Sequence, residues 1–148
     1  MLRENLISKG EAVMDTIQWD DRYNIQVPEI DAQHKRLVEL VNHLIAIQDQ
    51  KTTDEEMARI LGAMTSYLGE HFDTEEQMMI DHGYPALASH REQHQAFVAR
   101  TAYYIAVYQK SGALLKKDLL HFLKTWLVDH IGKTDAAFGA FLKNRGVM

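Results

Sequence analysis

The sequence of 148 residues contains no cysteine, and this absence excludes several classes of site at once. Disulfides, thiolate zinc sites, iron–sulfur clusters and covalently attached c-type haem all need cysteine sulfur. Any metal bound by this chain must therefore be held by nitrogen and oxygen atoms.

Long apolar runs and an excess of positive charge are also missing. No apolar run approaches the roughly 20 residues that cross a bilayer, so we expect no membrane span. The N-terminus, MLRENLISKGEAVMD, has scattered charges and no continuous apolar stretch, which indicates a cytoplasmic protein without a secretory signal. The net charge of −5 and the absence of a basic stripe argue against nucleic acid as a partner.

Strand signals are weak, whereas four segments carry apolar residues at helical spacing. Short connections between such helices favour an all-α fold, an antiparallel up-down-up-down four-helix bundle. The chain length fits one domain, over residues 14–148, preceded by a separate leader, residues 1–13, for which disorder is expected. Residues 14–30 are expected to form an irregular N-terminal arm, and a short C-terminal turn through Phe138 and Leu142 should follow the last helix.

The predicted helix ends rest on capping and breaking residues. Asp31 is the expected N-cap of the first helix, which should end near Gln48. Thr53 and Glu56 fit a capping box that opens the second helix. That helix should stop near residues 82–83, the third should run from Tyr84-Pro85 to Ser111-Gly112, and the fourth should end near Ile131.

Each predicted helix has one buried face defined by its apolar residues. The four faces contain His34, Leu37, Val38, Val41, Leu44 and Ile45; then Met57, Ile60, Leu61, Met64, Leu68, His71, Phe72, Glu75 and Met78; then Leu87, His90, His94, Phe97, Val98, Thr101 and Ile105; and finally Leu119, Leu120, Leu123, Trp126, Leu127 and His130.

The eight histidines are the compositional feature that needs an explanation. His71 and Glu75 are four residues apart, as are His90 and His94, so each pair projects from one side of its helix. These four residues lie in phase with the apolar stripes, where a polar side chain is costly unless it is paired or bound to metal. His34 and His130 point inward in the same way, so every helix directs a ligand-type residue at the core.

Asp135 follows His130 by five residues, which is about 140° around an ideal helix. Both side chains could not reach one site if the helix continued, so we expect the helix to end between them. Gly132 and Thr134 make such a break plausible and would leave Asp135 on a turn back toward the interior.

Each of these residues also has a simpler explanation. A single histidine on an apolar stripe is more often a hydrogen-bonded core residue than a metal ligand. The convergence of seven such residues on one core favours a metal site. His43, His82 and His121 fall off the stripes and are expected at the surface, and Glu70, Asp73 and Glu76 are expected to be solvated charges.

Ligand type alone leaves iron, zinc, manganese and copper open, because imidazole and carboxylate suit them all. The zinc-protease pattern H-E-x-x-H is absent, since the segment from His90 to His94 has its glutamate at a different position. The Glu-x-x-His motif of ferritin-like di-iron proteins is absent too.

The order and spacing of these residues resemble the bacteriohemerythrin branch of the hemerythrin family, over roughly residues 17–142. Gln26, where a glycine is common, and Gly132, where a larger apolar residue is common, depart from the pattern. The matching residues are Trp19, Tyr23, Ile30-Asp31-Ala32-Gln33-His34, His71-Phe72, Glu75-Glu76, Met79, Tyr84-Pro85, His90, His94, Trp126-Leu127, His130-Ile131, Asp135 and Phe141-Leu142.

The resemblance implies two non-haem iron ions with an oxo or hydroxo bridge. One iron would be held by His90, His94 and His130 and the other by His34 and His71, with Glu75 and Asp135 bridging them. The second iron then has about five donors, which leaves one open position for molecular oxygen. The oxygen pocket would be lined by Leu37, Trp126, Leu127 and Ile131, which would exclude water and protons.

The resemblance therefore implies a non-enzymatic, monomeric oxygen carrier, store or scavenger, with no catalytic residues, whose partner is an oxygen-consuming enzyme. Two alternatives stay open at this point. One is an oxygen or redox sensor, with residues 1–13 recruiting an output partner. The other is a di-iron enzyme that acts on peroxide or nitric oxide, although neither a second open position nor a proton donor can be named.

Overall fold

The computed structural model describes residues 15–47, 54–111 and 116–146. Within these ranges the chain forms the elements η1 (Asp21–Tyr23), α2 (Pro28–Ala46), α3 (Asp54–His82), α4 (Leu87–Ser111), α5 (Lys116–Asp129), η3 (His130–Asp135) and α6 (Ala136–Asn144). The predicted leader, residues 1–13, lies outside the described residues.

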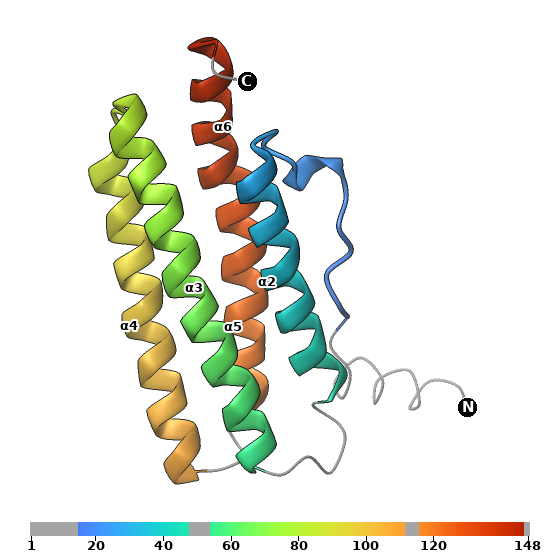
Figure 1. The fold of residues 1–148 in the computed structure, drawn as a ribbon. Coiled ribbons are helices and arrows are strands. Elements are labelled where there is room, and N and C mark those ends of the chain that lie inside the picture. The colour runs from blue at the N-terminus through green and yellow to red at the C-terminus, as the bar shows by residue number, and fades with distance from the viewer. Residues whose placement is uncertain (1–14, 48–53, 112–115, 147–148) are drawn as a thin grey trace.

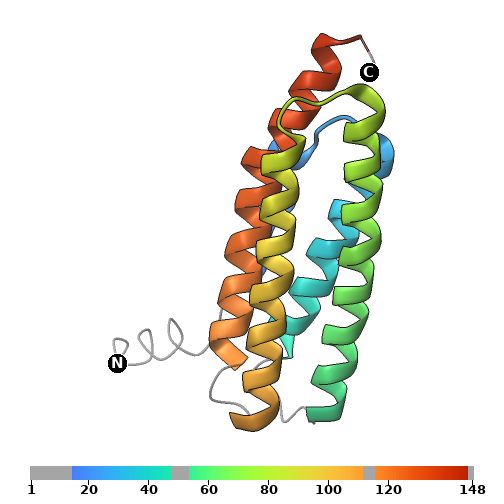
Figure 2. The same ribbon diagram turned by 90° about the vertical axis from the view of Figure 1, so that its left-hand side faces the viewer.

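Four long helices, α2 to α5, run side by side in alternating directions, and α6 continues the line of α5 (Figures 1 and 2). Each of α2 and α4 packs against both α3 and α5, so the four helices enclose one interior. The all-α, antiparallel four-helix bundle predicted from the hydrophobic spacing is confirmed. Across the described residues, none of the helices combines the length and the apolarity that crossing a membrane requires.

The N-terminal arm crosses the bundle surface and is held by side chains of α2. The Asn42 amide accepts from the backbone N–H of Ile17 and donates to its carbonyl oxygen, at 2.7 and 2.9 Å. The Asp31 carboxylate accepts from the backbone N–H groups of Ile25 and Gln26. Gln26 has a backbone φ of 67°, the left-handed region that glycine adopts without strain, which explains why a glycine is common there.

Two apolar clusters divide the interior along its length. One holds Leu44, Leu61 and Leu120 with their neighbours, and the other, at the end of the bundle near α6, holds Ile30, Met79 and Phe138 with theirs. Along each of α2, α3 and the α5–α6 helix, a ligand-type residue comes between residues of the two clusters. The polar residues therefore form a layer that is sealed by apolar side chains above and below.

The expected helix break between His130 and Asp135 is wrong. The chain continues without interruption from α5 through η3, a π-helix, into α6. A π-helix closes its hydrogen bonds five residues apart instead of four, so its wider turn brings residues i and i+5 to the same side. The C-terminal turn expected through Phe138 and Leu142 is likewise a helix, α6.

Some local predictions also need correction. Asp31 is not an N-cap, because α2 begins at Pro28 and Asp31 instead holds the arm. The third helix begins at Leu87, slightly after the predicted proline, and Val98 is 52% exposed although it was expected inside. Met79 rather than Met78 is fully buried. The second helix ends at His82 as predicted, but the capping-box residue Thr53 and the breaker Gly112 lie outside the described residues.

Candidate metal centre

All seven residues predicted as ligands converge in the polar layer and are buried. His34 comes from α2, His71 and Glu75 from α3, His90 and His94 from α4, and His130 and Asp135 from η3. The exposed fraction is 3% or less for each of the seven. Such burial of polar side chains is costly unless their charges and hydrogen-bonding atoms are satisfied within the layer.

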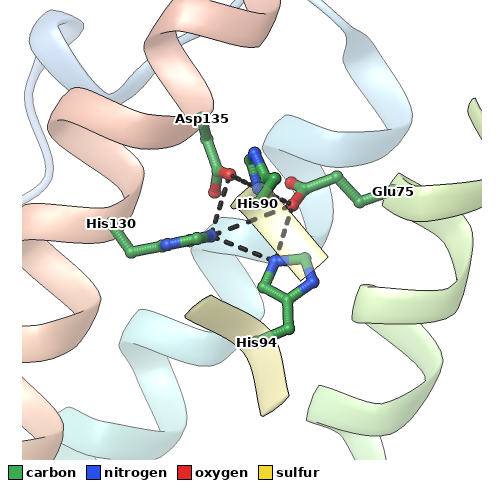
Figure 3. Close-up of side chains that lie close together, drawn as sticks. All are labelled: Glu75, His90, His94, His130 and Asp135. Atoms are coloured by element: carbon green, nitrogen blue, oxygen red, sulfur yellow. Dashed lines mark hydrogen bonds and ion pairs between the residues drawn. The ribbon is translucent and has the colours of Figure 1, made fainter. Parts of the chain in front are cut away.

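Five of these residues form one group whose ligand atoms lie within 4.8 Å of one another: Glu75, His90, His94, His130 and Asp135 (Figure 3). Glu75 Oε1 lies 2.8 Å from His90 Nε2 and 3.1 Å from His94 Nε2. Asp135 Oδ1 lies 2.9 Å from His90 Nε2 and 3.0 Å from His130 Nε2. The three rings therefore present the same nitrogen to the two carboxylates.

A second group consists of His34, His71, Glu75 and Asp135, and it shares both carboxylates with the first. His34 Nε2 lies 2.9 Å from Asp135 Oδ2 and 3.6 Å from Glu75 Oε2. His71 Nε2 lies 3.5 Å from the same Glu75 oxygen. Each carboxylate thus turns one oxygen to the three-histidine group and the other to the two-histidine group, as a bridging ligand does.

Several buried polar atoms in this layer lack a hydrogen-bond partner. Among the described residues, His34 Nε2, Glu75 Oε2 and both Asp135 oxygens have no hydrogen-bond partner, although nitrogens and oxygens lie within 4 Å. His94 Nε2 and His130 Nε2 face each other at 3.1 Å, and they can share a hydrogen bond only if one of the two carries a proton. Buried ligand atoms that gather in two groups sharing Glu75 and Asp135, several of them without a hydrogen-bond partner, fit a metal site.

Three histidines have a polar partner at the outer ring nitrogen. His71 Nδ1 lies 2.7 Å from Gln33 Oε1, His94 Nδ1 lies 2.7 Å from Glu76 Oε2, and His130 Nδ1 lies 3.2 Å from Gln93 Oε1. Each partner is an acceptor, so Nδ1 carries the proton and the Nε2 lone pair is free to bind a metal.

These outer partners follow a regular scheme. Gln33 precedes the ligand His34, Glu76 follows the ligand Glu75, and Gln93 precedes the ligand His94. Each partner therefore sits beside a ligand of its own helix and supports a histidine of the next: α2 supports α3, α3 supports α4, and α4 supports η3. The sequence prediction missed all three, and it was wrong to place Glu76 among the solvated charges.

In the metal-free protein, protons take the place of cations between the histidines and carboxylates. Burial opposes a charge on His34 and on His90, but the adjacent carboxylates of Asp135 and Glu75 outweigh it and raise the pKa of each ring to about 9. The pKa of His130 is raised in the same way, against burial, chiefly by the charge of Asp135.

His71 and the carboxylates shift in the other direction. Burial lowers the pKa of His71 to about 4, so this ring stays neutral at neutral pH. Burial would raise the pKa of Glu75 and of Asp135, yet the surrounding histidines hold both well below their usual values. Both carboxylates are therefore charged and ready to bind cations.

The four residues predicted to line an oxygen pocket lie in two different settings. Leu37, Leu127 and Ile131 are 1–4% exposed and belong to the larger apolar cluster. The Trp126 ring is partly exposed and stacks on His130, with ring centroids 4.3 Å apart and planes 11° apart. Trp126 thus packs against the three-histidine group.

His43 and His121 are exposed and His82 is partly exposed, in line with their predicted surface positions.

Comparison with known proteins agrees with this geometry. The profile of the hemerythrin HHE cation binding domain matches residues 26–142. A bacteriohemerythrin of Stenotrophomonas maltophilia is 32% identical over 130 residues, 88% of this chain and 84% of that protein. A bacteriohemerythrin of Pseudomonas aeruginosa is 34% identical over 125 residues, 84% and 80% of the two chains, and a myohemerythrin of Theromyzon tessulatum is 26% identical over 123 residues, 83% and 91%. The chain therefore belongs to the hemerythrin family of cation-binding domains.

Proposed function

We propose that this protein binds molecular oxygen reversibly at two non-haem irons, as a carrier, store or scavenger and not as an enzyme. The observation that carries the proposal is the pair of unequal metal-ligand groups that share Glu75 and Asp135. The names of the relatives, bacteriohemerythrin and myohemerythrin, support the same function. A cytoplasmic location, a monomeric state and supply of oxygen to an oxygen-consuming enzyme stay predictions.

The unequal ligand groups assign different roles to the two metals. His90, His94 and His130 with the two carboxylates offer five donors, whereas His34 and His71 with the same carboxylates offer four. Iron in nitrogen and oxygen sites commonly takes up to six donors, so the two-histidine group has more room for an external ligand. Two ferrous ions in this layer would supply the two electrons that reversible oxygen binding needs.

The surrounding side chains keep the layer dry. Leu37, Leu127 and Ile131 are buried in one apolar cluster, and Met79 and Phe138, both 0% exposed, lie in the other. Exclusion of water slows loss of bound oxygen as peroxide, because that loss requires protons. No acidic side chain other than the two bridging carboxylates is needed for the binding step.

Metal analysis and optical spectroscopy test the proposal together. The protein purified in air should contain about two irons per chain, because seven donors exceed what one metal needs. The absorption spectrum of the reduced protein should gain a charge-transfer band in air and lose it under vacuum. A metal content near one per chain, or zinc that iron cannot replace, would contradict the di-iron centre. Immediate irreversible oxidation would instead favour a sensor or an enzyme.

A further inference from the structure

His94 differs from the other supported histidines in the charge of its outer partner. Gln33 and Gln93, the partners of His71 and His130, are neutral amides, whereas Glu76 is a carboxylate. Each amide is oriented by a threonine: Gln33 donates to Thr74 Oγ1, and Gln93 accepts from Thr134 Oγ1. Glu76 is oriented instead by a cation, Arg91, whose Nε lies 3.0 Å from Glu76 Oε1.

The two oxygens of Glu76 have separate partners. Oε2 accepts from His94 Nδ1 at 2.7 Å, and Oε1 accepts from Arg91 Nε. A charged acceptor draws the Nδ1 proton outward and makes the ring a stronger donor at Nε2. Arg91 withdraws part of that negative charge, so it opposes the effect of Glu76 on the ring.

The position of this pair suits an adjustable contact. Side chains of Glu76 and Arg91 are 18% and 42% exposed, and both line a groove between α3 and α4 that reaches His94 and Phe72. Phe72 stacks on the His94 ring, with centroids 3.8 Å apart and planes 9° apart, and so fixes the ring plane. The ring is thus held by packing, and the Glu76 contact is left to set its electronic character.

We propose that Glu76 and Arg91 are positioning residues that act in opposite directions on the strength with which His94 Nε2 donates to a metal. Through His94 they favour the higher oxidation state for the metal in the three-histidine group. A more negative ligand set stabilises the higher charge, so this metal should be oxidised before the one held by His34 and His71. The assignment of iron rests on the proposed function, but the effect on donor strength does not.

Zinc tests donor strength without any redox chemistry. In the zinc-loaded protein, proton NMR should show the His94 Nδ1–H in a short, charge-assisted hydrogen bond, and Glu76→Gln should shift this resonance to higher field. The same substitution should weaken zinc binding to the three-histidine group by about tenfold, within the range of outer-partner effects. Asp73→Asn, which removes an exposed charge from the same groove without a contact to a histidine, is the matched control and should change neither measurement.

Potentiometric titration of the iron-loaded protein tests the opposed roles. Glu76→Gln should raise the reduction potential of the metal that is oxidised first by about 59 mV for one electron, which corresponds to a tenfold change in the binding of ferric relative to ferrous iron. Arg91→Gln should lower the same potential. Gln33→Glu, which gives His71 a charged partner, should narrow the gap between the two potentials. The double variant Glu76→Gln with Arg91→Gln tests whether Arg91 acts through Glu76 or through its own long-range charge. Arg91→Gln should have no further effect once Glu76 is glutamine.

Three results would overturn the proposal: shifts of the same sign in the two single variants, additive shifts in the double variant, or zinc binding and ring resonance unchanged in Glu76→Gln. Failure of the proposed function has a different signature. In that case iron is absent or does not bind oxygen reversibly, while zinc binding still responds to Glu76 and not to Asp73.

Discussion

His130 and Asp135 are five residues apart on one continuous helix, yet His130 Nε2 lies 3.0 Å from Asp135 Oδ1. The π-helical turn between them makes this contact possible, because its extra residue brings the two side chains to the same face. The turn also lets the fourth helix line supply both a terminal ligand and a carboxylate shared by the two groups. A local departure from α-helical geometry therefore completes the site.

Asp135→Asn tests that shared role. The amide keeps the size of the side chain but loses the charge and the ability to bridge two cations, so metal content should fall from about two per chain to about one or less. Elemental analysis beside far-ultraviolet circular dichroism measures both metal and fold. Asp129→Asn, at an exposed aspartate six residues earlier on the same helix line, should retain its full metal content. A fully loaded Asp135→Asn protein would remove Asp135 from the ligands.

Removal of metal should destabilise the bundle by several kcal/mol, because it leaves buried carboxylates and ring nitrogens without partners. The measurement is the thermal unfolding midpoint of the chelated protein, compared with that of the protein reloaded with iron or zinc. Equal midpoints would mean that the seven side chains are not held together by metal.

The metal-free protein should also lose stability as the pH rises from about 6.5 to about 9. His34 and His90 have a pKa of about 9 when folded and about 6.5 when unfolded, so the stability gained from their bound protons is complete below 6.5 and disappears through 9. Glu75 and Asp135, whose pKa values are lowered by folding, contribute unchanged over this window. The thermal midpoint measured against pH checks the sign.

Metal binding should show the reverse pH dependence, since a cation must displace the protons of His34 and His90 and therefore binds more tightly as the pH rises. Calorimetry in buffers of different ionisation enthalpy should detect release of protons on zinc binding at pH 7.5. His121→Asn, at an exposed site, is the control and should alter neither trend. If the thermal midpoint of the metal-free protein stays constant or rises between pH 6.5 and about pH 9, His34 and His90 do not hold their protons as expected.

Gly139 holds the N-terminal arm against α6. A Cβ atom at this position would lie 2.8 Å from Ile25 Cβ and 2.9 Å from its carbonyl oxygen, and the N–H of Ile25 is fixed by Asp31. Gly139→Ala should therefore cost about 1–3 kcal/mol, as overpacking of a core does. Gly62→Ala, on α3 with open space around it, should instead stabilise by roughly 0.5–1 kcal/mol. Chemical denaturation of both variants measures the contrast.

The sequence was sufficient for the four helices and for six of the seven buried polar side chains, because these follow from a repeat within a single helix. Asp135 was placed inward only through a helix break that the structure does not contain. Glu75 could be placed inward from its spacing to His71 alone. The role of Glu76 could not, since it depends on how α3 is rotated against α4, which brings the carboxylate to His94 from 18 residues away. Gln33 and Gln93 escaped prediction for the same reason.

The π-turn was not predicted because the α-helical rotation of about 100° per residue was assumed for residues 130–135, where the chain is π-helical. Gly132 and Thr134 indicated a break, but both lie on a continuous helix line. There Thr134 donates to Gln93, and a Cβ atom at Gly132 would lie at an ordinary contact distance of 3.8 Å from the Tyr23 ring. Val98 was expected inside because it lies on the apolar stripe of α4. It is exposed because it borders the groove between α3 and α4.

Leu127 is the side chain whose replacement best separates a dry oxygen-binding pocket from an exposed reactive centre. It is 4% exposed, lies one turn before His130 on the inner face of α5, and belongs to the same apolar cluster as Leu37 and Ile131. Leu127→Asn should admit water or offer a hydrogen bond, so autoxidation of the oxygenated protein should become faster while iron content stays the same.

Stopped-flow spectroscopy with parallel metal analysis measures both quantities for Leu127→Asn. Leu120→Asn, an equally buried leucine of α5 two turns farther from the ligands, is the matched control. It should lower the unfolding midpoint, because it also places an amide in the core, but it should leave the autoxidation rate unchanged. If a fully iron-loaded Leu127→Asn protein autoxidises at the original rate, Leu127 does not seal the oxygen site, and water exclusion by this part of the cluster cannot explain reversible binding.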